Sequence, residues 1–94
     1  MSTVFYSAQA LGDIEQFAEF LLLNDPQAAA GTGVLLIEAI TTLSRHPLLG
    51  RIVEHGLREL VISRGRTGYI ALYRFDAELD QVFILTIRHQ REIG

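Results

Sequence analysis

Arginine is the residue type best placed to carry chemistry in this sequence of 94 residues. All eight basic residues are arginines, and all of them follow residue 44. A guanidinium stays charged and binds carboxylate or phosphate oxygens in a bidentate manner, whereas proton transfer by lysine is excluded because the chain has no lysine. Six of the arginines lie on or beside three predicted C-terminal strands, together with His89: Arg58, Arg64, Arg66, Arg74, Arg88 and Arg91.

These arginines have two interpretations. On a compact sheet they could form one basic surface that binds phosphate or an acidic partner. On strand alternation alone, Arg58, Arg74 and Arg88 could instead be three isolated charges that face solvent.

Motifs for other chemistry do not occur in the sequence. Gly31-Thr32-Gly33 continues into an apolar run and lacks the Gly-Lys-Ser/Thr of a phosphate-binding loop. The three histidines have spacings that match no zinc motif, and there is no cysteine. No nucleophile-elbow pattern of a serine hydrolase is present. We therefore expect no metal and no cofactor.

Composition predicts one globular domain over residues 1–94, because 49% of the residues are hydrophobic and 20% are charged. Apolar runs such as Phe20–Leu23 and Val34–Ile37 are four residues long, far shorter than the ~20 residues that a membrane span needs. Residues 1–10 lack the basic and apolar regions of a signal peptide. We expect a cytoplasmic protein that does not associate with membranes. The net charge of −3 is uneven, since residues 1–44 carry five acids and no base.

The first half predicts a strand and two helices. Thr3–Tyr6 is β-branched and aromatic, and Ser7 is a good N-cap for a helix from Ala8 to about Leu23, where apolar residues recur every three or four positions. Asp25 and Pro26 are typical of a new helix start, and we expect this second helix to reach about Arg45, before His46-Pro47. The two helices should form a hairpin.

The second half predicts three strands with a period of two. These are Leu57–Ser63, Tyr69–Phe75 and Gln81–His89, joined by glycine-containing residues 63–68 and the polar turn Asp76–Asp80. The last strand is dense in Val, Phe and Ile, so it should lie in the sheet interior. The predicted fold class is α+β with the order β-α-α-β-β-β, a helical hairpin packed on a small, mostly antiparallel sheet.

The order and spacing of these elements resemble the ParE/RelE superfamily of bacterial toxins over nearly the whole chain. The residues that carry the resemblance are Ser7-Ala8-x-Ala10-x-x-Asp13-Ile14-x-x-Phe17-x-x-Phe20, Leu43-x-x-His46-Pro47-x-x-Gly50-Arg51, Leu57-Arg58-Glu59-Leu60, Tyr69-x-x-x-Tyr73-Arg74 and Ile84-Leu85-x-Ile87-Arg88-His89-x-Arg91. The resemblance implies a toxin of a type II toxin-antitoxin (plasmid stabilisation) system with a cognate antitoxin. In such systems the antitoxin binds operator DNA, so no direct recognition of DNA sequence by this chain is expected.

The superfamily has two mechanistic branches: RelE-like ribosome-dependent mRNA endoribonucleases, and ParE-like toxins that inhibit DNA gyrase without being nucleases. The RNase branch usually has an arginine directly after the tyrosine of the third strand, but here Ile70 follows Tyr69. Its lysine cluster and C-terminal tyrosine are also missing. Because such groups stabilise the charge of a transferring phosphate, the resemblance favours a gyrase inhibitor over an enzyme.

The resemblance also implies site residues. We expect the target, gyrase, to contact Arg58, Arg74, Arg88, His89 and Arg91, with acidic segments of the antitoxin as the alternative partner of these arginine-rich strands. If the chain is instead an RNase that acts on mRNA at the ribosome, the catalytic candidates are Arg64, Arg66, Arg88 and His89. We expect an amphipathic antitoxin helix to cover a groove lined by Phe17, Phe20, Leu21 and Leu35. For Phe17 and Leu21, ordinary core packing is an equal alternative.

A third possible function and the oligomeric state are left open. The third possible function is that of a non-toxic remnant that only binds its antitoxin. A homodimer and a heterotetramer with the antitoxin are both compatible with the resemblance.

Overall fold

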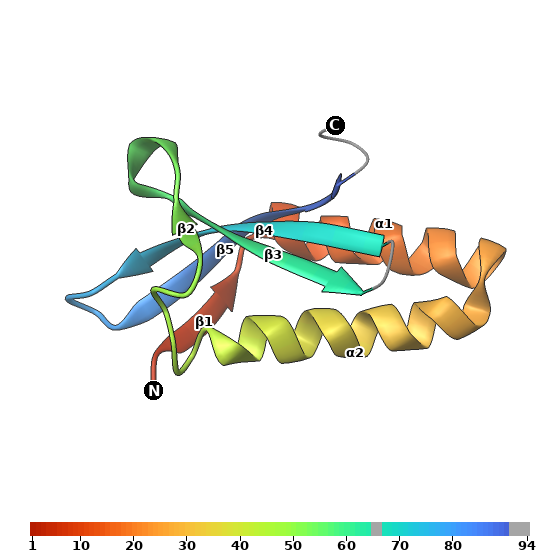
Figure 1. Ribbon diagram of the computed structural model, residues 1–94, viewed down its shortest axis with the longest axis horizontal. Coiled ribbons are helices and arrows are strands. Elements are labelled where there is room, and N and C mark those ends of the chain that lie inside the picture. The colour runs from red at the N-terminus through yellow and green to blue at the C-terminus, as the bar shows by residue number, and fades with distance from the viewer. Residues whose placement is uncertain (65–66, 91–94) are drawn as a thin grey trace.

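The computed structural model describes residues 1–64 and 67–90, with two helices and five strands in this part of the chain (Figure 1). In chain order the elements are β1 Thr3–Tyr6, α1 Ala8–Asn24, α2 Pro26–Thr42, β2 Arg51–Ile52, the 3₁₀ turn η1 Glu54–Gly56, β3 Arg58–Arg64, β4 Thr67–Asp76 and β5 Gln81–His89. The strands form one sheet in the order β1-β5-β4-β3-β2.

The sheet confirms the predicted fold class. β1 pairs parallel with β5, and all other neighbours are antiparallel. β5 lies between β1 and β4, in the sheet interior as its apolar composition predicts. The first and last strands of the chain are therefore hydrogen-bonded neighbours.

Both helices begin where the sequence predicts. The Ser7 hydroxyl accepts a hydrogen bond from the Ala10 amide at 2.9 Å, and the Asp25 carboxylate accepts one from the Ala28 amide at 3.2 Å. The predicted end of α2 at Arg45 is wrong, because the helix ends at Thr42. Residues 43–45 form tight turns with bonds of the i to i−3 type before Pro47, which disfavours helical backbone in the residue that precedes it.

The helices cover one face of the sheet, where the hydrophobic core lies. Neither helix is long and apolar enough to cross a membrane, and this holds for every helix in the described residues. The buried apolar residues come from both layers: Ala10, Leu36, Ile40 and Leu43 from the helical side, and Leu60, Ile62, Tyr69, Ala71, Tyr73, Val82, Ile84 and Ile87 from the sheet. The other face of the sheet carries no helix in the described part of the chain (Figure 1).

Strand β2 is not among the predicted strands. Its two residues, Arg51 and Ile52, pair with Glu59 and Arg58 at the edge of the sheet. A strand of two residues has no alternation that a pattern can detect. The turn that follows needs a positive φ at His55 (60°) and at Gly56 (73°), so the chain reverses direction here within a few residues.

Candidate target-binding face

The uncovered side of the sheet, called the open face below, is formed by alternate residues of four strands. Strand pairing places opposite residues on the same face, and burial shows which face the helices cover. By this criterion the open face contains Phe5, Glu59, Val61, Ile70, Leu72, Arg74, Phe83, Thr86 and Arg88, and Arg51 of β2 lies opposite Glu59 at its edge. It carries apolar side chains from four strands, Arg74 and Arg88 on its two central strands, and the Arg51-Glu59 ion pair at its edge.

Aromatic rings hold Arg74 in place on this face. Phe5 and Phe83 stack with their ring centroids 5.5 Å apart and an angle of 18° between the ring planes. The guanidinium carbon of Arg74 lies 5.2 Å from the centroid of Phe83, in cation-π distance. Arg74 is nevertheless exposed, so its guanidinium is both positioned by the ring and open to a partner.

Arg88 is the second arginine of the open face. It is exposed and lies opposite Ile70 in the β4-β5 ladder, whereas Arg74 lies opposite Phe83. The two ladder positions are separated by four residues of β4, which is roughly 13 Å at the usual rise of a strand. Leu72 and Thr86 form the pair between them. Arg74 and Arg88 thus lie on either side of the Leu72-Thr86 pair, and Glu59 is the next residue across the sheet from Leu72.

His89 lies on the other side of the sheet. It pairs with Tyr69 in the ladder, and its ring contacts the Tyr69 ring edge-on, with centroids 5.1 Å apart and an interplanar angle of 89°. Tyr69 is buried and makes a second edge-on contact with Phe17, at 5.1 Å. His89 therefore continues a row of aromatic rings on the helix-covered face and does not lie beside Arg88 on the open face.

Arg58 is engaged in holding a loop. Its Nη1 atom donates hydrogen bonds to the carbonyl oxygens of Gly50 at 2.8 Å and of Leu48 at 3.2 Å. The buried hydroxyl of Tyr73 accepts a bond from the Gly50 amide and donates one to the Pro47 carbonyl, both at 2.8 Å. Residues 47–50 are thus fixed to β3 and β4 by two side chains.

Gly50 is packed tightly in this loop. A Cβ atom at position 50 would lie 2.7 Å from the Glu59 carbonyl oxygen and 2.7 Å from the Tyr73 ring, so no larger residue fits without displacing backbone. Burial raises the pKa of Tyr73, while its bond to Gly50 and the charge of Arg58 partly oppose that shift.

The structure does not gather the expected target-binding residues on one surface. Arg74 and Arg88 share the open face, whereas Arg58 and His89 lie at helix-side positions. Arg66, Arg91 and the side chain of Arg64 lie outside the described residues. Sequence reasoning missed the apolar members of the open face, of which Phe5 and Phe83 are the largest. The available signal was the alternation of β5, which places Phe83 between the buried Val82 and Ile84.

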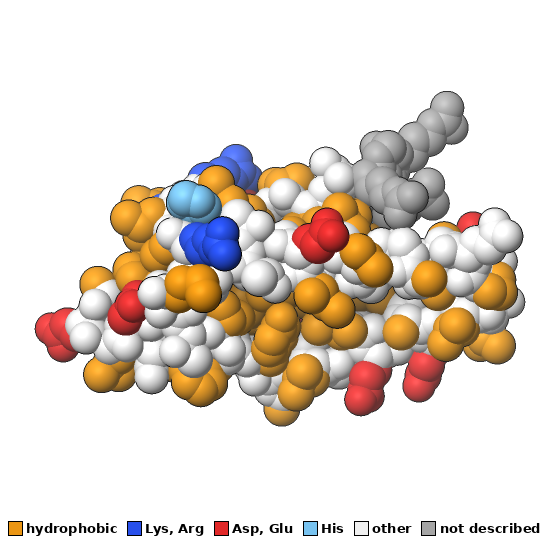
Figure 2. Space-filling model, turned by 90° about the horizontal axis from the view of Figure 1, so that it is seen from below, with side chains coloured by type: hydrophobic (Ala, Val, Ile, Leu, Met, Phe, Trp, Pro, Cys, Tyr) orange, Lys and Arg blue, Asp and Glu red, His pale blue; other side chains and the backbone are white. Residues whose placement is uncertain are grey.

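The four residues expected to bind an antitoxin differ in exposure. Phe17 and Leu35 are half-buried and pack against the core, and Leu21 is also half-buried. Phe20 is 64% exposed on α1. Figure 2 views the molecule from the side on which α2 lies in Figure 1, and shows hydrophobic side chains spread over much of this surface. The helical hairpin therefore carries apolar surface outside the core.

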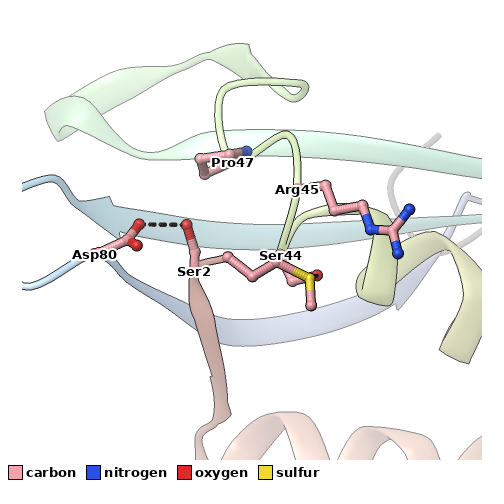
Figure 3. Close-up of a pocket in the computed structure, with 6 residues that line it drawn as sticks. Ser2, Ser44, Arg45, Pro47 and Asp80 are labelled. Atoms are coloured by element: carbon pink, nitrogen blue, oxygen red, sulfur yellow. Dashed lines mark hydrogen bonds between the residues drawn. The ribbon is translucent and has the colours of Figure 1, made fainter.

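A hollow of about 580 Å³ lies where β1, the end of α2 and the β4-β5 turn meet (Figure 3). It is lined by Met1, Ser2, Ser44, Arg45, Pro47 and Asp80. Its polar groups are used within the fold, because the Ser2 hydroxyl donates to Asp80 and the Ser44 hydroxyl donates to the Thr41 carbonyl. Figure 3 shows Arg45 pointing away from Asp80. Among residues 1–64 and 67–90, no three His, Asp or Glu side chains lie close enough together to hold a metal ion.

These features define a small α+β domain with a helical hairpin on one face of its sheet and a surface of apolar and charged side chains on the other. Comparison with known proteins identifies the family. Residues 4–94 match the family model described as ParE toxin of the type II toxin-antitoxin system parDE. The chain belongs to this family of toxins, within the ParE/RelE superfamily.

Individual relatives agree with this assignment. Two toxins of Caulobacter vibrioides are similar in sequence: RelE1, 38% identical over 77% of each chain, and RelE3, 34% identical over 98% of each chain. The structure of the RelBE2 toxin-antitoxin complex of Mycobacterium tuberculosis contains a similar chain. The match covers 94% of this chain and 96% of that chain, with 29% identity and a TM-score of 0.65. The chromosomal ParDE system of P. aeruginosa shares the fold, with a TM-score of 0.74 at 22% identity over 95% and 96% of the chains.

Proposed function

We propose that this toxin acts by binding and inhibiting DNA gyrase through the open face of its sheet. The composition of that face is the main support. Aromatic residues and arginine are enriched in the energetically important centres of protein interfaces, and here the Phe83 ring of the Phe5-Phe83 stack holds Arg74 while Arg88 lies beyond Leu72 on the same face. This surface suits contact with another protein.

The separation of Arg88 from His89 supports a mechanism without RNA cleavage. Cleavage of RNA needs groups that transfer protons and groups that stabilise charge around one phosphate. Of the four catalytic candidates, Arg88 and His89 are the two with described side chains, and they lie on opposite faces of the sheet. A phosphate bound over one face of the sheet would therefore meet one of these side chains and not the other.

The alternative function is that of a RelE-like endoribonuclease with the ribosome and mRNA as partners. The relatives from Caulobacter vibrioides favour it, since both are named as RelE toxins. A third function, that of a non-toxic antitoxin-binding remnant, makes no use of the open face. All three proposals place the chain in the cytoplasm.

The order in which synthesis stops after induction separates these functions. The chain is induced alone in growing bacteria, and nascent DNA and nascent protein are pulse-labelled over the following minutes. We expect DNA synthesis to fall first. If protein synthesis stops first, the RNase alternative is correct, and if neither changes, the chain is not toxic. Arg88→Glu should abolish the effect, and Arg45→Glu, an exposed arginine beyond the end of α2, is the matched control.

For the antitoxin, we propose that its amphipathic segment covers the helical hairpin beside Phe20. The support is that Phe20 is 64% exposed next to the half-buried Phe17 and Leu21, which leaves an apolar surface that continues from the core. The antitoxin shields the toxin by occupying this surface.

A pair of matched variants tests the antitoxin surface. Phe20→Ser should weaken antitoxin binding roughly 10- to 100-fold, as loss of a large interface side chain does. Leu11→Ser is the control, because Leu11 is 51% exposed on the opposite flank of the same helix. Equal affinities of the two variants, measured by titration calorimetry, would contradict this placement.

A further inference from the structure

Strand β5 contains a bulge at Leu85, between the buried residues Ile84 and Ile87. Tyr73 of β4 pairs with Ile84, but the preceding Leu72 pairs with Thr86, so Leu85 is one residue more than the ladder needs. A bulge of this kind changes which side chains point to which face beyond it.

The bulge decides which of two neighbouring basic residues reaches the open face. Ile84 before the bulge and Ile87 after it are both buried on the helix side, although they are three residues apart. Strict alternation from Ile84 would place Arg88 on the helix side and His89 on the open face. With the bulge, Arg88 is exposed on the open face and His89 packs on Tyr69.

Two side chains of the α1 segment bind the polar groups that the bulge displaces. The Ile87 amide donates a hydrogen bond to Asp13 Oδ2 at 2.9 Å, and the Ser7 hydroxyl donates one to the Leu85 carbonyl at 2.7 Å. Asp13 is itself held by Gln9, whose Nε2 donates to Oδ1 at 2.9 Å. The bonds from Ser7 and Asp13 both come from the first part of α1, where Ser7 is the N-cap.

Ser7, Asp13 and the bulge at Leu85 form a unit that no sequence pattern indicates. A bulge breaks the regular ladder, and a displaced backbone group that lies inside the protein needs another partner. Here both partners are side chains of a different layer, 74 residues and 78 residues away along the chain. The register of β5 beyond Leu85 therefore depends on α1.

We propose that Asp13 and Ser7 are positioning residues that hold the β5 bulge and thereby aim Arg88 at the open face. The register part of this inference stands on the hydrogen bonds alone. Its consequence for toxicity rests on the proposed function, in which Arg88 contacts the target.

Thiol accessibility tests the register directly, since the chain has no cysteine of its own. Arg88→Cys and His89→Cys are made separately, and the rate of alkylation of each thiol by a maleimide is measured. The thiol at position 88 should react roughly tenfold faster than the one at position 89, because reactivity follows exposure. With Asp13→Ala added, this ratio should fall towards one.

Two further variants separate positioning from simple stability. Asp13→Asn keeps an oxygen that accepts from the Ile87 amide, so it should preserve the ratio. Deletion of Leu85 makes the ladder regular while leaving Arg88 on the open face, so in the Asp13→Ala background it should restore the ratio. Glu15→Ala, an exposed acid of the same helix, is the control. A ratio that stays unchanged in Asp13→Ala would overturn the inference, as would failure of the deletion to restore it.

Toxicity is then measured on the same variants without the cysteines. Asp13→Ala should lose toxicity, and Asp13→Asn should keep it. If the thiol ratio falls but toxicity persists, the register inference holds and the proposed role of Arg88 is wrong. If toxicity is lost while the thiol ratio is unchanged, Asp13 does not act by positioning Arg88.

Discussion

The two faces of the sheet use the same strands for different purposes. In β4, Tyr69, Ala71 and Tyr73 point to the helices and are at most 2% exposed. The residues between them, Ile70 and Leu72, are half-buried on the face without helices. Alternate residues of one strand thus serve the core and a second, uncovered surface, so a chain of 94 residues carries both.

The polar side chains of the two faces also differ in whether they are bonded within the fold. On the helix side, Tyr73 and Arg58 hold the loop at residues 47–50, and Asp13 holds the bulge. Within the described residues, no buried side-chain nitrogen or oxygen lacks a hydrogen-bond partner. On the open face, Arg74 and Arg88 are exposed. Charges on the covered side therefore stabilise the fold, whereas Arg74 and Arg88 on the open side are accessible to solvent.

Replacing one isoleucine on each face should give the largest contrast in stability. Ile84→Ala removes a fully buried side chain and should lower the free energy of unfolding by about 3 to 4 kcal/mol. Ile70→Ala makes the same chemical change on the open face and should cost about 1 kcal/mol. Urea unfolding followed by circular dichroism measures both. Equal losses would mean that the open face belongs to the core.

Removal of one hydroxyl tests the polar part of the covered face. Tyr73→Phe leaves the Gly50 amide and the Pro47 carbonyl without their partner, so it should cost about 2 kcal/mol. The same unfolding assay gives the value. A loss below about 0.5 kcal/mol would show that water replaces the hydroxyl and that the loop does not depend on it.

Alkaline pH should weaken the covered face. Burial raises the pKa of Tyr69 and of Tyr73 above 10.0, their ordinary value, so the folded protein keeps these phenols protonated where the unfolded chain has begun to lose the protons. Stability is therefore complete below about pH 10 and falls as pH rises through the folded pKa values. Unfolding curves between about pH 9 and 11 measure the slope. In Tyr73→Phe the slope should be shallower, and an unchanged slope would contradict this cause.

The smallest effect is expected at the edge of the open face. Arg51 Nη2 lies 2.8 Å from Glu59 Oε1, but the Arg51 side chain is 76% exposed. Such an ion pair contributes about 0 to 1 kcal/mol. Arg51→Ala should therefore lower the free energy of unfolding by less than about 1 kcal/mol, and high salt should remove the difference. A larger loss would show that β2 depends on this pair.

Regular elements were predictable because their patterns are local. The N-caps Ser7 and Asp25 gave the starts of both helices, and the apolar composition of β5 gave its place inside the sheet. The two residues of β2 have no such pattern. The end of α2 was misplaced by three residues because turns at residues 43–45 continue the helical direction without helical bonds.

The candidate site was less predictable for a physical reason. Counting alternate residues along β5 fails at Leu85, and only the ladder with β4 shows that Arg88, and not His89, faces the open side. The sequence alone suggests that Arg58 is a surface charge. In the structure its partners are backbone carbonyls of the loop at residues 47–50, and no side-chain pattern predicts that this loop lies nearby. Bonds between distant backbone and side-chain groups leave no periodic signal.

Inhibition of gyrase by the purified chain tests the central claim most directly. Supercoiling of relaxed plasmid by gyrase is measured with the unchanged chain, with Arg88→Glu and with Arg45→Glu, alongside cleavage of mRNA on ribosomes. The account predicts that the unchanged chain and Arg45→Glu inhibit gyrase and leave mRNA intact, and that Arg88→Glu requires about 100-fold more protein for the same inhibition. Cleavage of mRNA without inhibition of gyrase, or full inhibition by Arg88→Glu, would contradict it.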